Sequence, residues 1–114
     1  MKIKLLFFLI IIFFGSCKST IKEFRNEIGE VSVLKGEDFK ILFNENHAEG
    51  QTWSLVQEFD SSILQYVKSF YHGPADGLTD FIFHAKAKGE TILKFNLIEY
   101  SDVKRQAVIK IKIN

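Results

Sequence analysis

The sequence predicts an all-β domain, an antiparallel sandwich of about seven short strands. Apolar residues alternate with polar residues in several short segments, which is the period of a half-buried strand. Glycine-containing turns such as 35–37 and 88–90 separate these segments, and no long segment shows the helical period. The length of 114 residues allows one domain of this kind.

The first half of the domain contains three expected strands. Valines alternate with polar neighbours in 31–33, directly before the glycine turn at 35–37. Phenylalanine and isoleucine then alternate with other residues in 39–43. A polar loop at 44–50 separates this segment from a third one at 53–55, where Trp and Leu alternate. These segments are each long enough for a short strand.

The second half begins with an ambiguous segment. Ser61 could cap a short helical turn that carries Ile63 and Leu64, whereas 66–71 has the composition of a strand. Alternation is clear again at 81–85 and 107–113, and the segment 92–98 follows the turn at 88–90 as another expected strand. The expected loops of the domain are 44–50, 73–77 and 100–104.

The alternating residues define an expected core between two sheets. One side of each strand would face inward and bury its large apolar side chains. We interpret Trp53 as a member of this core rather than as an exposed binding residue. The inward-facing sets are Phe39, Ile41 and Phe43, then Trp53 and Leu55, then Phe81 and Phe83, and finally Ile109 and Ile111.

The N-terminus has the pattern of an export signal. Lys2 and Lys4 precede an uninterrupted apolar run at 5–14, which is shorter than the about 20 residues that cross a bilayer. Gly15-Ser16-Cys17 follows and resembles the lipobox of bacterial lipoproteins. That resemblance implies cleavage before Cys17, acylation of its thiol and a stable lipid anchor in the bacterial cell envelope. The lipid would hold the protein at the periplasmic face or at the cell surface.

These features divide the chain into three parts. We expect a lipoprotein signal peptide at 1–16, the lipidated cysteine and a tether at 17–29, and the sandwich domain at 30–114. Removal of the signal takes away two of the 15 basic residues and none of the 14 acidic ones, so the formal charge changes from +1 to −1. A nucleic-acid partner is not expected, because such proteins usually carry a basic face.

Common catalytic and metal-binding motifs are absent from the sequence. It contains no H-E-x-x-H, no G-x-S-x-G and no phosphate-binding glycine loop. His47, His72 and His84 lack the spacing of metal ligands, and the single cysteine excludes an internal disulfide. We therefore expect neither an enzyme, nor a cofactor, nor a bound metal.

Several motifs stand in one order along the domain. They are Gly36-Glu37 before the segment 39–43, the loop Asn46-His47-Ala48-Glu49-Gly50 with Trp53 three residues later, the Phe-x-Phe-x-Ala segment at 81–85, and Gly89. In this order they resemble the chagasin-like inhibitors of papain-family cysteine peptidases, over about residues 30–114. The family's first loop reads N-P-T-T-G, and its third loop carries R-P-W. Here Glu99 stands at the position of the arginine, and Tyr100 supplies an aromatic ring.

The resemblance implies a seven-stranded immunoglobulin-like fold with three loops gathered at one end. Such loops wedge into the active-site cleft of a papain-like peptidase, with the first loop over the catalytic cysteine. Inhibition is then reversible blockage without chemistry, and the inhibitor is expected to be a monomer. The implied peptidase-binding residues are Asn46, His47, Ala48, Glu49 and Gly50 in the first loop, Asp76 and Gly77 in the second, and Glu99 and Tyr100 in the third.

Two alternatives remain open at the level of sequence. Asn46 can shape its loop through side-chain to backbone bonds, and Gly50 can serve only to allow a positive φ. The whole domain can also be an immunoglobulin-like envelope module that inhibits no peptidase and binds another protein or has a structural role.

Overall fold

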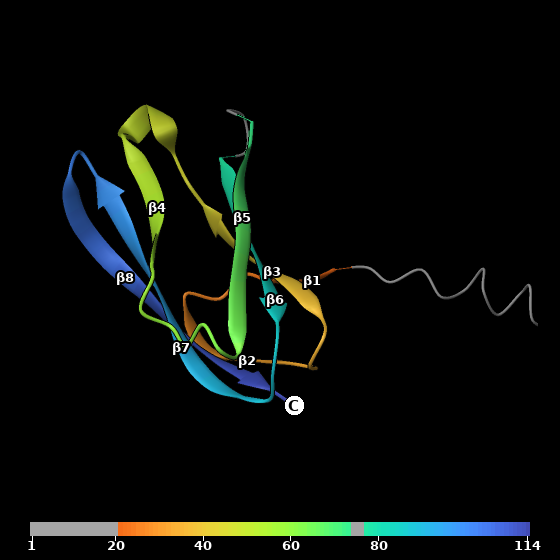
Figure 1. Cartoon of the computed structure of the whole chain (residues 1–114). Helices are drawn as coiled ribbons and strands as arrows, with labels where there is room; N and C mark the ends of the chain where they lie inside the picture. The colour runs from red at the N-terminus through yellow and green to blue at the C-terminus, as the bar shows by residue number, and fades with distance from the viewer. Residues whose placement is uncertain (1–20, 74–76) are drawn as a thin grey trace, which may run out of the picture.

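The computed structural model describes residues 21–73 and 77–114, which fold into two facing four-stranded sheets (Figure 1). The predicted signal peptide, Cys17 and Asp76 lie outside the described residues. The elements are β1 (Lys22–Phe24), β2 (Ile28–Val33), β3 (Asp38–Asn44), the short 3₁₀ helix η1 (His47–Glu49), β4 (Gln51–Val56), β5 (Leu64–His72), β6 (Leu78–Ala85), β7 (Gly89–Glu99) and β8 (Asp102–Ile113). No helix among the described residues is long and apolar enough to cross a membrane.

The predicted all-β sandwich is confirmed. One sheet has the strand order β1-β3-β6-β5, and the other has the order β2-β8-β7-β4. The consecutive pair β7 and β8 forms a long antiparallel hairpin, and β6 pairs with β3 on one side and with β5 on the other. The two sheets pack their apolar faces together, as in an immunoglobulin-like sandwich.

The pairing at the sheet edges differs from the prediction of about seven antiparallel strands. The described chain has eight strands, and β1 and β2 run parallel to β3 and β8. Strand β1 reads Lys-Glu-Phe, which is too short and too charged to show alternation, and it lies in the segment 17–29 expected as a tether. Phe24 packs edge-on against Phe39 at 6.2 Å, so the sheet begins at Lys22 rather than at residue 30.

The predicted core residues lie between the sheets. Phe39 stacks on Phe83 with ring centroids 5.6 Å apart, and Phe95 of β7 meets Phe83 edge-on at 6.3 Å. All three rings are fully buried, and burial of each contributes roughly 1.5–3 kcal/mol to folding. The members of the predicted set are all buried or, for Leu55, partly buried: Phe39, Ile41, Phe43, Trp53, Leu55, Phe81, Phe83, Ile109 and Ile111.

Two connections differ from their predicted form. The segment at Ser61 is a turn without a helix, and Asp60 is its capping residue, because the Asp60 carboxylate accepts a hydrogen bond from the Ser62 N–H at 2.9 Å. The predicted loop 100–104 is only a two-residue turn. Residues from Asp102 onward pair with β7, and a register shift between Leu97 and Ile98 hides this pairing from a simple alternation pattern.

The turn at 35–37 closes the end of the sandwich where β3 begins. Gly36 donates its N–H to the Ala85 carbonyl at 2.8 Å, which joins the turn to β6. The Glu37 carboxylate accepts the Leu34 N–H at 2.6 Å and pairs with Lys22 at 3.2 Å. The Leu34 N–H is the main reason that the pKa of Glu37 is lowered, and the Lys22 ammonium lowers this pKa further.

Candidate functional site

The three predicted binding loops converge at one end of the sandwich. We define the loop end as residues 45–50, 71–73, 77 and 99–102. In Figure 1, η1, the C-terminal end of β5 and the turn between β7 and β8 all lie toward the top of the molecule. The strand β3 runs into this end at Asn44, and β8 leaves it at Asp102. The convergence implied by the sequence resemblance is therefore present.

The first loop is built around a side-chain cap. The Asn46 side-chain oxygen accepts hydrogen bonds from the N–H groups of Ala48 at 3.1 Å and Glu49 at 3.3 Å. This caps η1 in the way that Asn favours at helix starts. Gly50 ends the turn with a φ of 72° and donates its N–H to the His47 carbonyl at 3.1 Å. Asn46 and Gly50 therefore shape the loop, which is the structural role that the sequence left open for them beside peptidase binding.

Gly50 also joins the first loop to the third. A Cβ atom on Gly50 would stand 2.6 Å from Cε1 of Tyr100, which is too close for any side chain. The Tyr100 N–H also donates to the Gly50 carbonyl at 3.4 Å. The tyrosine ring thus packs directly on the glycine backbone, and only glycine at position 50 leaves it room.

The third loop is a tight turn that exposes an aromatic ring. Tyr100 and Ser101 both have a positive φ, of 48° and 74°, which is the conformation of a type I′ hairpin turn. Residues other than glycine seldom adopt it. Tyr100 is 72% exposed, whereas its neighbour Glu99 is only half-buried and stands opposite Gln51 of β4.

Glu45 is a loop-end residue that sequence reasoning missed. It is only 4% exposed, and one of its carboxylate oxygens accepts the Trp53 N–H at 3.2 Å. The other oxygen pairs with Nε2 of His47, and the His47 ring stacks on Tyr71 at 3.9 Å. The sequence signal that could have identified Glu45 is the alternation in β3, because position 45 continues the inward-facing series of Ile41 and Phe43.

Gly77 joins the second loop to the first. Its carbonyl accepts the Glu45 N–H, and it has a φ of 54°. A Cβ on Gly77 would collide with the Glu45 backbone carbonyl, which cannot move aside as a side chain can. Gly77, like Gly50, is therefore a point where one loop rests on another. Asp76, the other predicted residue of this loop, is not described.

The histidines of the domain form separate pairs with carboxylates. His47 pairs with Glu45, Nε2 of His72 lies 2.9 Å from Asp80, and Nδ1 of His84 lies 2.6 Å from Asp38. Within residues 21–73 and 77–114, no group of three or more His, Cys, Asp or Glu side chains is arranged to hold a metal ion. The polar residues of the loop end brace its loops.

Trp53 lies under the loop end as a core residue. Its side chain is 4% exposed and stacks on Phe43 with centroids 4.4 Å apart. The indole N–H donates to the Asn44 carbonyl at 2.9 Å, so the tryptophan also ties β4 to the end of β3. The interpretation of Trp53 as a core residue is therefore correct.

Known structures share the fold of this chain. The cysteine protease inhibitor EhICP2 from Entamoeba histolytica superposes with a TM-score of 0.69 at 13% identity, over 82% of this chain and 95% of that one. The chain has a chagasin-like fold. Amebosin superposes with a TM-score of 0.63 at 14% identity, over 84% of this chain and 100% of that one. PbICP-C, solved in complex with falcipain-2, superposes with a TM-score of 0.64 at 10% identity, over 85% and 96%.

The chagasin-like fold is recognisable in structure and not by sequence comparison. No protein-family profile and no curated protein sequence matches the chain. The identities of 10–14% are consistent with this result, because they leave few positions in common. What is shared is the course of the backbone through both sheets.

Proposed function

We propose that this protein is a reversible inhibitor of papain-like cysteine peptidases and that its loop end enters the active-site cleft. The observation that carries the proposal is that the first loop, the third loop and Gly77 of the second loop meet at one end of a chagasin-like fold. EhICP2, which has this fold, is a cysteine protease inhibitor, and PbICP-C was solved in complex with falcipain-2. The inhibitor would perform no chemistry and would act by occupying the cleft.

The bracing of the loops favours tight binding. Gly50 and Gly77 fit the first loop against the other two, and the buried Glu45 holds it from below. Loops that are already ordered lose little conformational entropy when a partner binds. A cleft that receives all three loops would bury about 1,600 Å² in total, the usual size for protease–inhibitor complexes.

Tyr100 is the expected anchor of the contact. Exposed aromatic rings near the centre of an interface contribute much of its binding energy. The ring is 72% exposed, yet its position is set by the glycine beneath it and by the tight turn that carries it. Glu49 and Glu99 flank this region, so we expect the target to present basic groups directly opposite these two carboxylates.

Membrane anchoring through Cys17 is the second part of the proposal. Only residues 18–21 separate Cys17 from β1 in the sequence. Lys22 pairs with Phe39 near the start of β3, whereas the loop end follows Asn44 at its finish. The chain therefore enters the sandwich away from the loop end, and a lipid on Cys17 would leave the loops pointing away from the membrane of the bacterial envelope.

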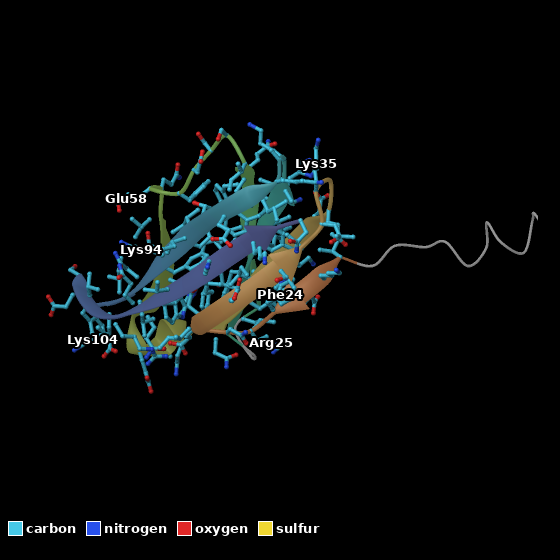
Figure 2. All side chains as sticks on the ribbon, turned by 90° about the horizontal axis from the view of Figure 1, so that it is seen from below. Phe24, Arg25, Lys35, Glu58, Lys94 and Lys104 are labelled. Carbon is cyan, nitrogen blue, oxygen red and sulfur yellow. The ribbon has the colours of Figure 1, made fainter. Side chains whose placement is uncertain are left out.

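An inhibition assay tests the proposed function. The protein lacking residues 1–17, which keeps every described strand, is titrated against several papain-like peptidases. We expect reversible inhibition, weakened at least about tenfold by Tyr100→Ala, because a central aromatic anchor contributes about 2 kcal/mol or more. Lys35→Ala, at the opposite end of the domain, is the matched control and should inhibit as wild type does (Figure 2).

The alternative is a non-inhibitory immunoglobulin-like envelope module. It predicts that the folded domain inhibits no papain-like peptidase at tens of micromolar, and that Tyr100→Ala instead weakens binding to another envelope protein. The same purified variants therefore separate the two functions.

A further inference from the structure

A hollow opens between the two sheets beside the loop end. Strand β1 pairs with β3 only at 39–41, and β2 pairs with β8 only from residue 108 onward. Among the described residues, the last part of β3 and the first part of β8 therefore have no strand beside them on this edge. The gap has a volume of about 120 Å³. The residues that line it are Arg25, Glu27, Leu42, Phe43, Asn44, Leu78 and Arg105.

The hollow carries more positive than negative charge. Arg105 holds the Glu27 carboxylate with two parallel hydrogen bonds, from Nε at 2.7 Å and from Nη2 at 3.1 Å. Arg25 lines the same space, and no carboxylate of the described residues forms an ion pair with it. Two arginines and one glutamate thus line the hollow, so its formal charge is +1, which favours a second carboxylate there.

The remaining walls fit a short apolar stem with a polar tip. Leu42, Phe43 and Leu78 supply apolar surface, and Asn44 adds polar groups. Pockets for drug-sized molecules usually measure about 300–1,000 Å³, so a space of this size suits a single side chain. Arg105 already donates two hydrogen bonds to the Glu27 carboxylate, which is the geometry in which Arg binds carboxylates.

We propose that this hollow binds an acidic side chain, Asp or Glu, of the protein that binds at the loop end. This rests on the proposed function, in which that protein is the peptidase. Asn44 and Leu78 are next to Glu45 and Gly77 in the sequence, so a partner bound at the loops would lie beside the hollow. The site adds a charged contact outside the three loops and selects partners that carry an acidic residue beside the cleft.

Trp53 gives a direct signal for occupation of the hollow. It is the only tryptophan of the chain, and the Arg105 guanidinium carbon lies 5.6 Å from the centre of its ring. A carboxylate that draws Arg105 toward it changes the surroundings of the indole. The emission of Trp53 can therefore be followed in the full-length protein in a neutral detergent.

The test titrates the protein with N-acetylglutamic acid α-amide and with N-acetylglutamine amide at constant ionic strength. We expect a saturable change of Trp53 emission with the acid and none with the neutral amide. Arg25→Gln should weaken the response to the acid about threefold or more, as expected for loss of an exposed ion pair. Glu27→Gln should strengthen the response, because it removes the carboxylate that now occupies the guanidinium donors of Arg105.

Lys104→Gln is the matched control, because it removes one positive charge, as Arg25→Gln does. Lys104 belongs to β8 (Figure 2) and does not line the hollow. It should respond as wild type does, and melting curves should show each variant folded. Equal responses to the acid and the amide, or an unchanged response in Arg25→Gln, would overturn the proposal. Probe binding without peptidase inhibition would instead overturn the proposed function, so the two failures are distinguishable.

Discussion

The ring of Tyr100 packs directly on the backbone of Gly50. A Cβ at position 50 would lie 2.6 Å from Cε1 of the ring, and the two residues also share a backbone hydrogen bond. They belong to different loops, separated by β4 to β7. This contact fixes the exposed ring that we expect to enter the peptidase, and it makes position 50 sensitive to a single methyl group.

Gly50→Ala should therefore disturb both stability and binding. The left-handed conformation at φ 72° costs alanine about 1–2 kcal/mol, and the methyl also displaces Tyr100. We expect a lower free energy of unfolding in urea and weaker inhibition. In a Tyr100→Ala background the same substitution should cost less, because the displaced ring is gone. Equal costs in both backgrounds would show that the ring does not press on position 50.

Gly77→Ala should destabilise the domain more than Gly73→Ala. Both glycines have a positive φ, of 54° and 58°, so alanine suffers similar backbone strain at each. Among the residues that the structure describes, none lies within 4 Å of a Cβ at position 73, whereas one at position 77 meets the Glu45 carbonyl. We expect a difference in unfolding free energy of about 1 kcal/mol or more. Equal losses would mean that the second loop can retreat from the first.

Glu45→Ala should lower the unfolding free energy by about 1–3 kcal/mol, because it leaves the buried Trp53 N–H without its acceptor. It also removes the partner of His47. Glu49→Ala is the control, an exposed acid of the same loop, and should change stability by less than about 0.5 kcal/mol. A similarly small effect of both substitutions would show that Glu45 does not stabilise the first loop.

Glu37 should give the domain a stability that is lost in acid. The Leu34 N–H lowers the pKa of this carboxyl in the folded state, so its contribution is present above the ordinary pKa of Glu. It disappears as the pH falls through the lowered folded value. We expect Glu37→Gln to be less stable than wild type at pH 7, with the difference shrinking as the pH falls below the ordinary Glu pKa of about 4.3. A difference that grows as the pH falls would contradict this sign.

Cys17→Ser should release the full-length protein from membranes. The lipobox-like Gly15-Ser16-Cys17 predicts that acyl chains on the cysteine hold the protein. Membrane and soluble fractions of bacteria that express each form are compared by immunoblot. A serine variant that stays with the membrane would contradict lipid anchoring through this residue.

Much of the sandwich is predictable because its strands alternate cleanly. Phe39, Ile41 and Phe43 read as one inward face in the sequence, and the structure buries all three. Strand β1 could not be predicted in this way, since its edge pairing depends on backbone groups of β3 rather than on its own side chains. Parallel edge pairing leaves no signal in a short, charged segment.

The loop end was predictable in place and only partly in detail. Asn46, Gly50 and Gly77 were identified from the order of motifs, and each shapes or joins the loops. The contact of Tyr100 with Gly50 is a long-range packing relationship that no local pattern reports. The same holds for the pairing of Arg105 with Glu27, whose residues lie 78 positions apart in the chain.

Competition with substrate shows whether the loop end occupies the active-site cleft of a peptidase. Inhibition of a sensitive papain-like peptidase is measured at several substrate concentrations with the domain lacking residues 1–17. If the loop end occupies the cleft, the inhibitor concentration that gives half inhibition rises linearly with substrate concentration, and Tyr100→Ala shifts the whole series to higher inhibitor concentration. Inhibition that is independent of substrate, or no inhibition by the folded domain at tens of micromolar, would contradict the account.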